Sequence, residues 1–131
     1  MTLVEAARWA PSCFNSQPWR FVYAVKDSAH WLAMLKLLMD MNQAWAQHAG
    51  ALIAVVSRNT FEANNNPAPT HSFDTGAAWM SLALQAQTMG LASHAMWGIE
   101  RGDIPKALNL PDNMQIQAIV AVGESGDKSE L

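Results

Sequence analysis

The stretch that most constrains the fold of this sequence is Ala10-Pro11-Ser12-Cys13-Phe14-Asn15-Ser16-Gln17-Pro18-Trp19-Arg20-Phe21. Pro11 lacks a backbone N–H and disfavours the helical conformation at the residue before it, so a helix arriving from the N-terminal side should end here. Pro18 restricts its own predecessor in the same way and leads into an extended segment. The polar residues between the two prolines therefore lie on a loop with fixed ends, where proteins often place binding groups. The alternative is an ordinary connection between a helix and a strand.

The residues on either side of this loop indicate alternating helices and strands. We expect a helix over residues 2–9 and a strand over 21–25. A helix over 30–41, with its apolar residues in a stripe, and a short second helix over 42–49 should follow. The run 51–56 is apolar on both faces, which predicts a central strand of a sheet.

The middle of the chain predicts a long loop followed by a long helix. Residues 57–73 include three consecutive asparagines and two prolines and lack an apolar rhythm, as is typical of a lid or binding loop. Between residues 74 and 89 nearly every residue is apolar or small, so we expect a helix that is buried on several sides. Asp74 should cap the start of this helix, and Gly90 should end it.

The last third of the chain completes an alternating pattern. We expect a strand over residues 92–98, a short helix over 104–108 and a last strand over 116–122. The chain should form a single domain over residues 1–124, followed by a polar tail over 125–131. Helices that alternate with strands in this way predict a three-layer α+β or α/β domain.

The composition excludes some classes of partner and favours others. The 131 residues carry a net charge of −3, and the eight lysines and arginines are not clustered, which argues against a nucleic-acid partner. Half of the residues are apolar, with six tryptophans and eight methionines, so we expect a homodimer that covers part of this surface. A single cysteine, no secretory leader pattern and no apolar run longer than 49–56 predict a cytoplasmic protein without a membrane partner.

Several familiar catalytic patterns are absent or weak. There is no glycine-rich dinucleotide or Walker motif, and no nucleophile-elbow pattern surrounds the His71, Ser72 and Asp74 run, so a hydrolase is disfavoured. Cys13 follows the expected end of a helix, with no sequence signal for activation, and is better explained as a packed thiol. No metal-ligand spacing links the histidines with the acidic residues, so we expect no metal site.

A longer pattern does point to a family. Residues 6–12, Ala-Ala-Arg-Trp-Ala-Pro-Ser, begin a segment that resembles the flavin-binding signature of the nitroreductase family and that continues with Asn15, Gln17, Pro18, Trp19 and Phe21. Residues 74–78, 89–91 and 120–123 look like later landmarks of the same family, so the resemblance extends roughly from Leu3 to Glu124. It implies an α+β, three-layer nitroreductase-like fold. In that fold a central, mostly antiparallel sheet is flanked by helices, with a long buried central helix.

The resemblance also implies a function. Nitroreductase-like enzymes hold FMN at the interface of a homodimer and use NADH or NADPH to reduce a nitro compound or a related small-molecule electron acceptor. The sequence does not distinguish this reaction from that of a deiodinase-like or flavin-cleaving relative. The flavin carries the chemistry in such enzymes, so no protein side chain is expected to be catalytic. The resemblance implies two groups of cofactor-binding residues, one on the loop and one after a strand: Pro11, Ser12, Cys13, Asn15 and Gln17, and Met96, Trp97 and Gly98.

This sequence departs from the family at the phosphate-binding end. Relatives usually carry an arginine-rich segment ahead of the first helix and a basic residue beyond the last strand. Here the chain begins with Thr2-Leu3-Val4-Glu5, and the corresponding later residue would be Lys128. We therefore expect weak FMN binding. The alternative is a non-catalytic or fragmentary nitroreductase-like dimer that acts as a binding or interaction protein.

Overall fold

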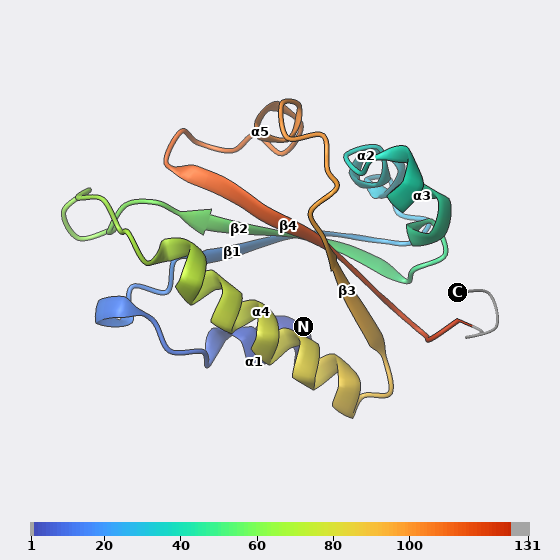
Figure 1. Ribbon diagram of the computed structural model, residues 1–131, viewed down its shortest axis with the longest axis horizontal. Coiled ribbons are helices and arrows are strands. Elements are labelled where there is room, and N and C mark those ends of the chain that lie inside the picture. Colours follow the sequence, from blue (N-terminus) through green and yellow to red (C-terminus); the bar gives the residue numbers. More distant parts are fainter. Residues whose placement is uncertain (1, 127–131) are drawn as a thin grey trace.

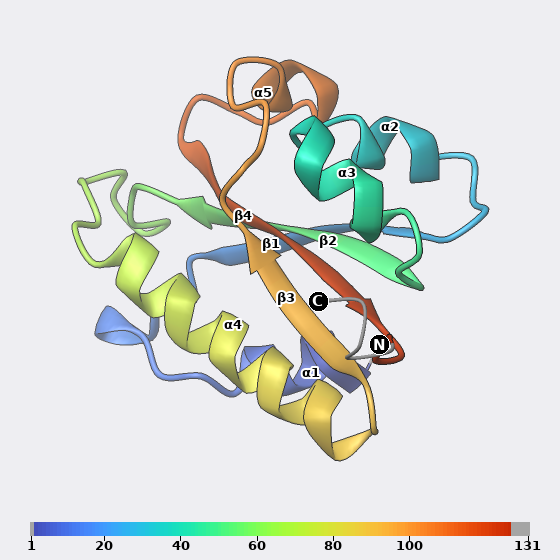
Figure 2. The same ribbon diagram turned by 45° about the vertical axis from the view of Figure 1, so that its right-hand side comes forward.

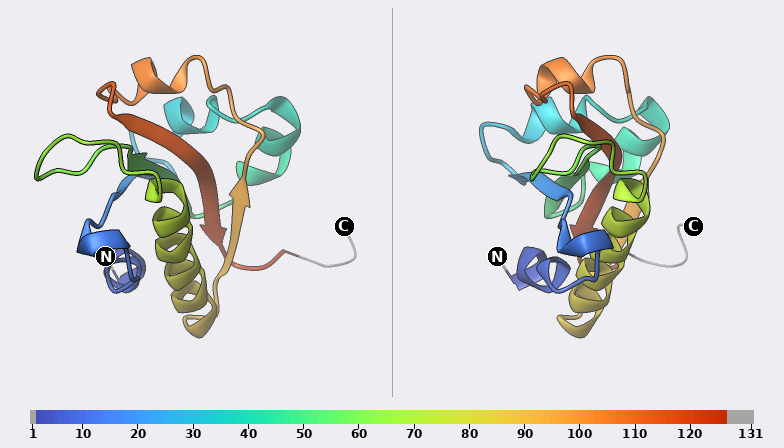
Figure 3. Two further views of the ribbon diagram at one scale, coloured as in Figure 1. Left: turned by 60° about the vertical axis from the view of Figure 1, so that its left-hand side comes forward. Right: turned by 90° about the vertical axis from the view of Figure 1, so that its left-hand side faces the viewer.

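The computed structural model describes residues 2–126. Its helices and strands alternate along the chain as α1 (Thr2–Arg8), η1 (Cys13–Asn15), β1 (Trp19–Val25), α2 (Trp31–Leu35), α3 (Asp40–Ala46), β2 (Ala51–Arg58), α4 (His71–Thr88), β3 (Ala92–Met96), α5 (Ile104–Ala107) and β4 (Met114–Gly123). The four strands form one antiparallel sheet in the order β1-β2-β4-β3 (Figure 1). Helices α1 and α4 cover one face, and α2, α3 and α5 cover the other (Figures 2 and 3). The predicted three-layer α+β fold with an antiparallel sheet is confirmed.

The central strand β2 explains why both faces of the sheet are covered. Six consecutive residues, 52–57, are buried along it. Because successive side chains of a strand point to opposite faces, this burial requires that both faces of the sheet are covered. Leu52 and Val56 belong to the core beneath α2, α3 and α5. Ile53 and Val55 belong to a second core beneath α1 and α4. The prediction of a strand that is apolar on both faces is therefore confirmed.

Helix α4 is buried along one stripe and exposed along the opposite one. Its buried apolar residues are Ala78, Leu82 and Ala86, and the first two belong to the core that α4 shares with the sheet and α1. On the other side, Met80 is 52% exposed and Leu84 is 56% exposed. The sequence predicts a helix that is buried on several sides, whereas in the single chain only one side of α4 is buried.

The ends of α4 differ in how well the sequence predicts them. Gly90 ends the helix with φ +75°, and its N–H donates to the carbonyl of Gln87 while the N–H of Leu91 donates to Ala86, as in a Schellman motif. The predicted C-terminus is therefore confirmed. The helix begins at His71, before the predicted Asp74, so the prediction of Asp74 as the helix cap is wrong.

The predicted helix over 30–41 is wrong, because the structure has two short helices there. Between α2 and α3 the backbone of Met39 is extended, with ψ 151°, and its N–H donates to the carbonyl of Gly98 at 3.0 Å. Leu38 forms an isolated antiparallel bridge with Ile99. The backbone pairing with residues 98 and 99 therefore overrides the local preference for one continuous helix.

The remaining differences concern the ends of elements. Strand β1 begins at Trp19, where the sequence predicts residue 21, and β3 ends at Met96, before the predicted Gly98. The structure describes the predicted tail only as far as Gly126, so its residues 127–131, with Lys128, lie outside the described part. Among the helices of residues 2–126, none combines the length and apolar character needed to cross a bilayer.

Candidate functional site

The loop between α1 and β1 holds several non-glycine residues in the left-handed region of φ. Phe14, Asn15 and Gln17 have φ values of 52°, 53° and 46°. Asparagine tolerates this conformation better than most residues, whereas it is unusual for a bulky residue such as phenylalanine. Phe14 is also 89% exposed, although its ring meets that of Phe61 edge-on at 5.9 Å. Strained, exposed backbone of this kind is concentrated at binding sites in proteins.

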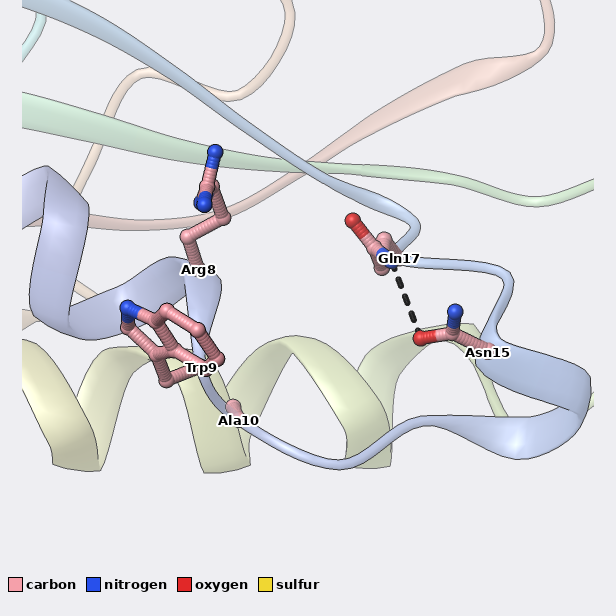
Figure 4. Close-up of a pocket in the computed structure, with 5 residues that line it drawn as sticks. All are labelled: Arg8, Trp9, Ala10, Asn15 and Gln17. Carbon is pink, nitrogen blue, oxygen red and sulfur yellow. Dashed lines mark hydrogen bonds between the residues drawn. The ribbon is translucent and has the colours of Figure 1, made fainter.

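Side chains of the loop hold this conformation from within. The Ser12 hydroxyl accepts a hydrogen bond from the backbone N–H of Gln17 at 3.0 Å. The Gln17 side-chain amide donates to Asn15 Oδ1 at 2.9 Å (Figure 4). The Arg20 guanidinium donates to the carbonyls of Gln17 and Trp19 at 3.0 and 2.7 Å. The predicted residues Ser12, Asn15 and Gln17 are therefore brought together, and Arg20 supports them.

A buried carboxylate ties the loop to the start of α4. Asp74 is 5% exposed, and its Oδ2 accepts hydrogen bonds from the Cys13 N–H at 3.1 Å and from the Thr70 hydroxyl at 3.0 Å. The residue that the sequence predicts as a helix cap is instead the anchor of the loop. Its partner Cys13 is 61 residues away in sequence, so no local pattern could reveal the contact.

A pocket of about 430 Å³ opens beside this loop. Its wall combines Arg8, Trp9 and Ala10, from the end of α1, with the side chains of Asn15 and Gln17 (Figure 4). Arg8 lies 3.5 Å from Glu5 in an exposed ion pair, which holds a side chain only weakly. The pocket therefore offers a cation, an indole and two amides, which suits a planar polar ligand.

The second predicted segment, Met96–Gly98, lies on the other edge of the sheet. The Met96 side chain is 2% exposed and packs in the core, so only its backbone can face a ligand. Trp97 is 67% exposed. The Asn42 side-chain amide donates to the Gly98 carbonyl at 2.9 Å, and a Cβ on Gly98 would lie 2.6 Å from that amide nitrogen. Any larger residue here would displace the Asn42 amide.

The two predicted groups of site residues are not joined within one chain. The polar loop leads into β1, one edge of the sheet, whereas Met96 ends β3, the opposite edge, with β2 and β4 between them (Figure 1). The sheet order therefore separates the two groups by two strands within one chain.

His71 and Asp74 make shorter contacts outside the disfavoured triad run, while the Ser72 hydroxyl lies 3.4 Å from His71 Nδ1. His71 Nδ1 lies 2.7 Å from the hydroxyl of Ser57, which is fully buried and accepts a hydrogen bond from the side chain of Gln117 at 2.8 Å. Gln117 is the extra residue where the pairing of β2 and β4 shifts register. Asp74 bonds to Cys13 and Thr70, so these residues form no Ser-His-Asp arrangement within the described part of the chain. Within residues 2–126 no three His, Cys, Asp or Glu side chains gather as a metal site would require.

Comparison with known proteins extends over the whole fold. The Nitroreductase family model matches residues 1–41 and 24–124. A solved structure described as an oxidoreductase containing FMN is 48% identical with a TM-score of 0.93, and the match covers 99% of this chain and 67% of that chain. A protein of Archaeoglobus fulgidus, named for a proposed NADH dehydrogenase/NAD(P)H nitroreductase activity, is 26% identical over 98% of this chain and 74% of its own length.

The match to a second curated relative covers a shorter part of this chain. An uncharacterised 15.4 kDa protein of Mycolicibacterium smegmatis is 34% identical over 69% of this chain, and the match spans 59% of the relative's length, less than two thirds. The family model, by contrast, includes the polar loop, all four strands and α4. On this evidence the chain belongs to the nitroreductase family.

Proposed function

We propose that the chain is an FMN-dependent oxidoreductase that uses NADH or NADPH to reduce nitro compounds or related small-molecule acceptors. The observation that carries the proposal is the preformed loop Ser12–Gln17, whose strained backbone is held by its own side chains and by Asp74. Its support comes also from the 48% identical oxidoreductase that contains FMN. The nicotinamide donor is suggested by the name of the Archaeoglobus fulgidus relative.

The polar groups of the loop fit the edge of a flavin ring. That edge alternates carbonyl acceptors with an N–H donor, so it is matched by side-chain amides, which carry both kinds of group. Asn15 Oδ1 accepts from Gln17, which leaves the Asn15 amide N–H groups and the Gln17 oxygen for a ligand. The Ser16 hydroxyl is buried without a partner among the described residues. Pro11, Ser12 and Cys13 would complete this side of the cofactor site.

Bound FMN would supply two-electron transfer, which for a nitro acceptor balances as R–NO₂ + NAD(P)H + H⁺ → R–NO + NAD(P)⁺ + H₂O. The chain's own residues would bind and orient the cofactor. Asn15 and Gln17 would hold the ring edge, and the backbone of Met96 to Gly98 would approach the ring from the other side. Trp97, which is exposed in a single chain, would exclude water there.

We propose further that the active species is a homodimer, because each chain carries only half of this arrangement. The exposed stripe of α4, with Phe73 at 82%, Met80 at 52% and Leu84 at 56% exposure, offers an apolar surface for a second copy. A stable dimer of this kind buries about 2,000 Å² or more. The loop of one protomer and residues 96–98 of its partner would then bound the same flavin.

The test compares two asparagines that both adopt positive φ. Asn15→Gly keeps the backbone conformation and removes the amide, and should weaken FMN binding by about 5- to 150-fold, as expected for a lost hydrogen bond of ~1–3 kcal/mol. Asn109→Gly makes the same change at φ 49° on a distant exposed turn and should leave FMN binding unchanged. FMN titration by fluorescence quenching, with melting temperatures, measures both.

Two outcomes would count against the proposal. Purified protein that shows no saturable FMN binding would favour the non-catalytic dimer. Equal losses of FMN affinity in Asn15→Gly and Asn109→Gly would mark Asn15 as a residue of loop structure alone. Cys13→Ser removes only the thiol and keeps the backbone N–H that donates to Asp74, so turnover should stay nearly unchanged. A complete loss of activity would indicate a role for the thiol.

A further inference from the structure

An arginine and a tryptophan stack on each other directly after β3. The Arg101 guanidinium carbon lies 3.3 Å from the centroid of the Trp97 ring, in a cation–π contact. The indole is nevertheless 67% exposed. One face of the ring is therefore covered by the guanidinium, and much of the remaining ring surface is open to a ligand.

Among the described residues, Arg101 differs from the other arginines in having no hydrogen-bond acceptor or carboxylate partner. Arg8 lies 3.5 Å from Glu5, and the side chains of Arg20 and Arg58 lie 3.8 and 3.5 Å from Glu62. Within residues 2–126 no carboxylate or carbonyl accepts a hydrogen bond from the Arg101 side chain, and its Nη2 is buried without a partner. The other two guanidinium nitrogens, Nε and Nη1, are not buried in this way, and their unused donors are suited to an anion supplied from outside the chain.

The backbone that carries the pair is fixed. The Glu100 N–H donates to the Leu37 carbonyl at 2.8 Å, and Ile99 pairs with Leu38. The Arg101 N–H donates to the Ile99 carbonyl at 3.0 Å. Because the segment is held against the end of α2, the ring and the guanidinium are preorganised, which reduces the entropy lost on binding a ligand.

We propose that Trp97 and Arg101 form an electron-acceptor subsite that selects planar aromatic compounds bearing a carboxylate. This inference rests on the proposed function, since it places the acceptor beside the segment 96–98. The indole offers a stacking surface for an electron-poor ring, and the guanidinium offers its positive charge and the donors other than the buried Nη2 to a carboxylate. Neutral acceptors would use the ring alone.

The test uses a matched pair of acceptors, 4-nitrobenzoate and 4-nitrobenzyl alcohol, with the flavin-loaded protein. Arg101→Met should raise the ratio of the KM for nitrobenzoate to the KM for the alcohol at least tenfold. Arg101→Lys, which keeps the charge and loses the guanidinium donors, should give an intermediate ratio. Lys106→Met removes one charge from the exposed surface of α5 and should leave the ratio unchanged.

A binding measurement on flavin-free protein gives a readout apart from turnover. In ¹⁵N NMR spectra, 4-nitrobenzoate should shift the indole N–H signal of Trp97, and Arg101→Met should abolish the shift. An unchanged KM ratio in Arg101→Met, or a rise only in the KM for NADPH, would overturn the proposal. If 4-nitrobenzoate shifts the Trp97 signal of the wild-type protein but the protein binds no FMN, the proposed function is rejected, whereas binding of a carboxylate at Trp97 and Arg101 is supported.

Discussion

The anchoring of the loop by Asp74 gives the sharpest prediction of the structure. Asp74 is almost fully buried and accepts two hydrogen bonds, from the Cys13 N–H at 3.1 Å and from the Thr70 hydroxyl at 3.0 Å. Its position in the first turn of α4 also places the negative charge where the helix dipole favours it. We predict that Asp74→Ala destabilises the protein and releases the loop.

The magnitude follows from these contacts. Hydrogen bonds to a charged group contribute about 1.5–3 kcal/mol each, and the dipole about 0.3–1 kcal/mol. The Thr70 hydroxyl, at the N-terminus of α4, can turn to water after the substitution, whereas the Cys13 N–H is left partly buried. We therefore expect Asp74→Ala to lower the free energy of unfolding by about 2–4 kcal/mol. Asp74→Asn keeps one acceptor oxygen and should cost about half as much.

Urea unfolding measures the loss of stability, and hydrogen exchange at the Cys13 amide measures the release of the loop. Asp112→Asn is the matched control, because Asp112 is exposed in the turn before β4 and its substitution should change stability by less than about 0.5 kcal/mol. If Asp74→Asn behaves like this control, or if stability falls while the Cys13 amide keeps its protection, the anchoring role is refuted.

Three further predictions concern other elements. Gly90→Ala should destabilise the protein by about 1–2 kcal/mol in urea unfolding, since φ +75° is strained for alanine; an unchanged midpoint would contradict the Schellman end. Gly98→Ala should cost a similar amount by displacing the Asn42 amide, and the double variant with Asn42→Ala should lose less than the sum of the single losses; strict additivity would exclude the clash. Met80→Glu should give monomers in light scattering, whereas Leu32→Glu, at a site that is 66% exposed outside α4, should leave the dimer intact. A Met80→Glu protein that is still a dimer would show that α4 does not form the interface.

The sequence predicts the parts of the fold that local chemistry determines. Pro11 and Pro18 delimit the loop because each restricts its own neighbourhood, and Gly90 ends α4 because few other residues adopt its backbone conformation. The alternation of buried residues along β2 likewise needs only the period of a strand. These features are encoded within a few residues, so a single sequence suffices to predict them.

The sequence does not predict features that depend on residues far apart in the chain. The helix expected over 30–41 breaks where Leu38 and Met39 pair with residues 98 and 99, and nothing within the apolar stripe signals that partner. Arg101 is absent from the expected site for the same reason. Its stacking on Trp97, and its lack of an acceptor within residues 2–126, become visible only in three dimensions.

The conformational cost of the polar loop is the strongest physical reason to regard it as a binding element. Left-handed backbone at Phe14, Asn15 and Gln17 costs about 1–2 kcal/mol per residue, a few kcal/mol in total, against a net stability of ~5–15 kcal/mol for a typical domain. A loop that only joined α1 to β1 could avoid this cost with glycine. Here the strain is instead offset by the hydrogen bonds that Ser12 and Asp74 accept from the loop backbone, and the side-chain amides stay at the pocket. An arrangement held in place before any ligand arrives lowers the entropy cost of binding, which is the property that a flavin site requires.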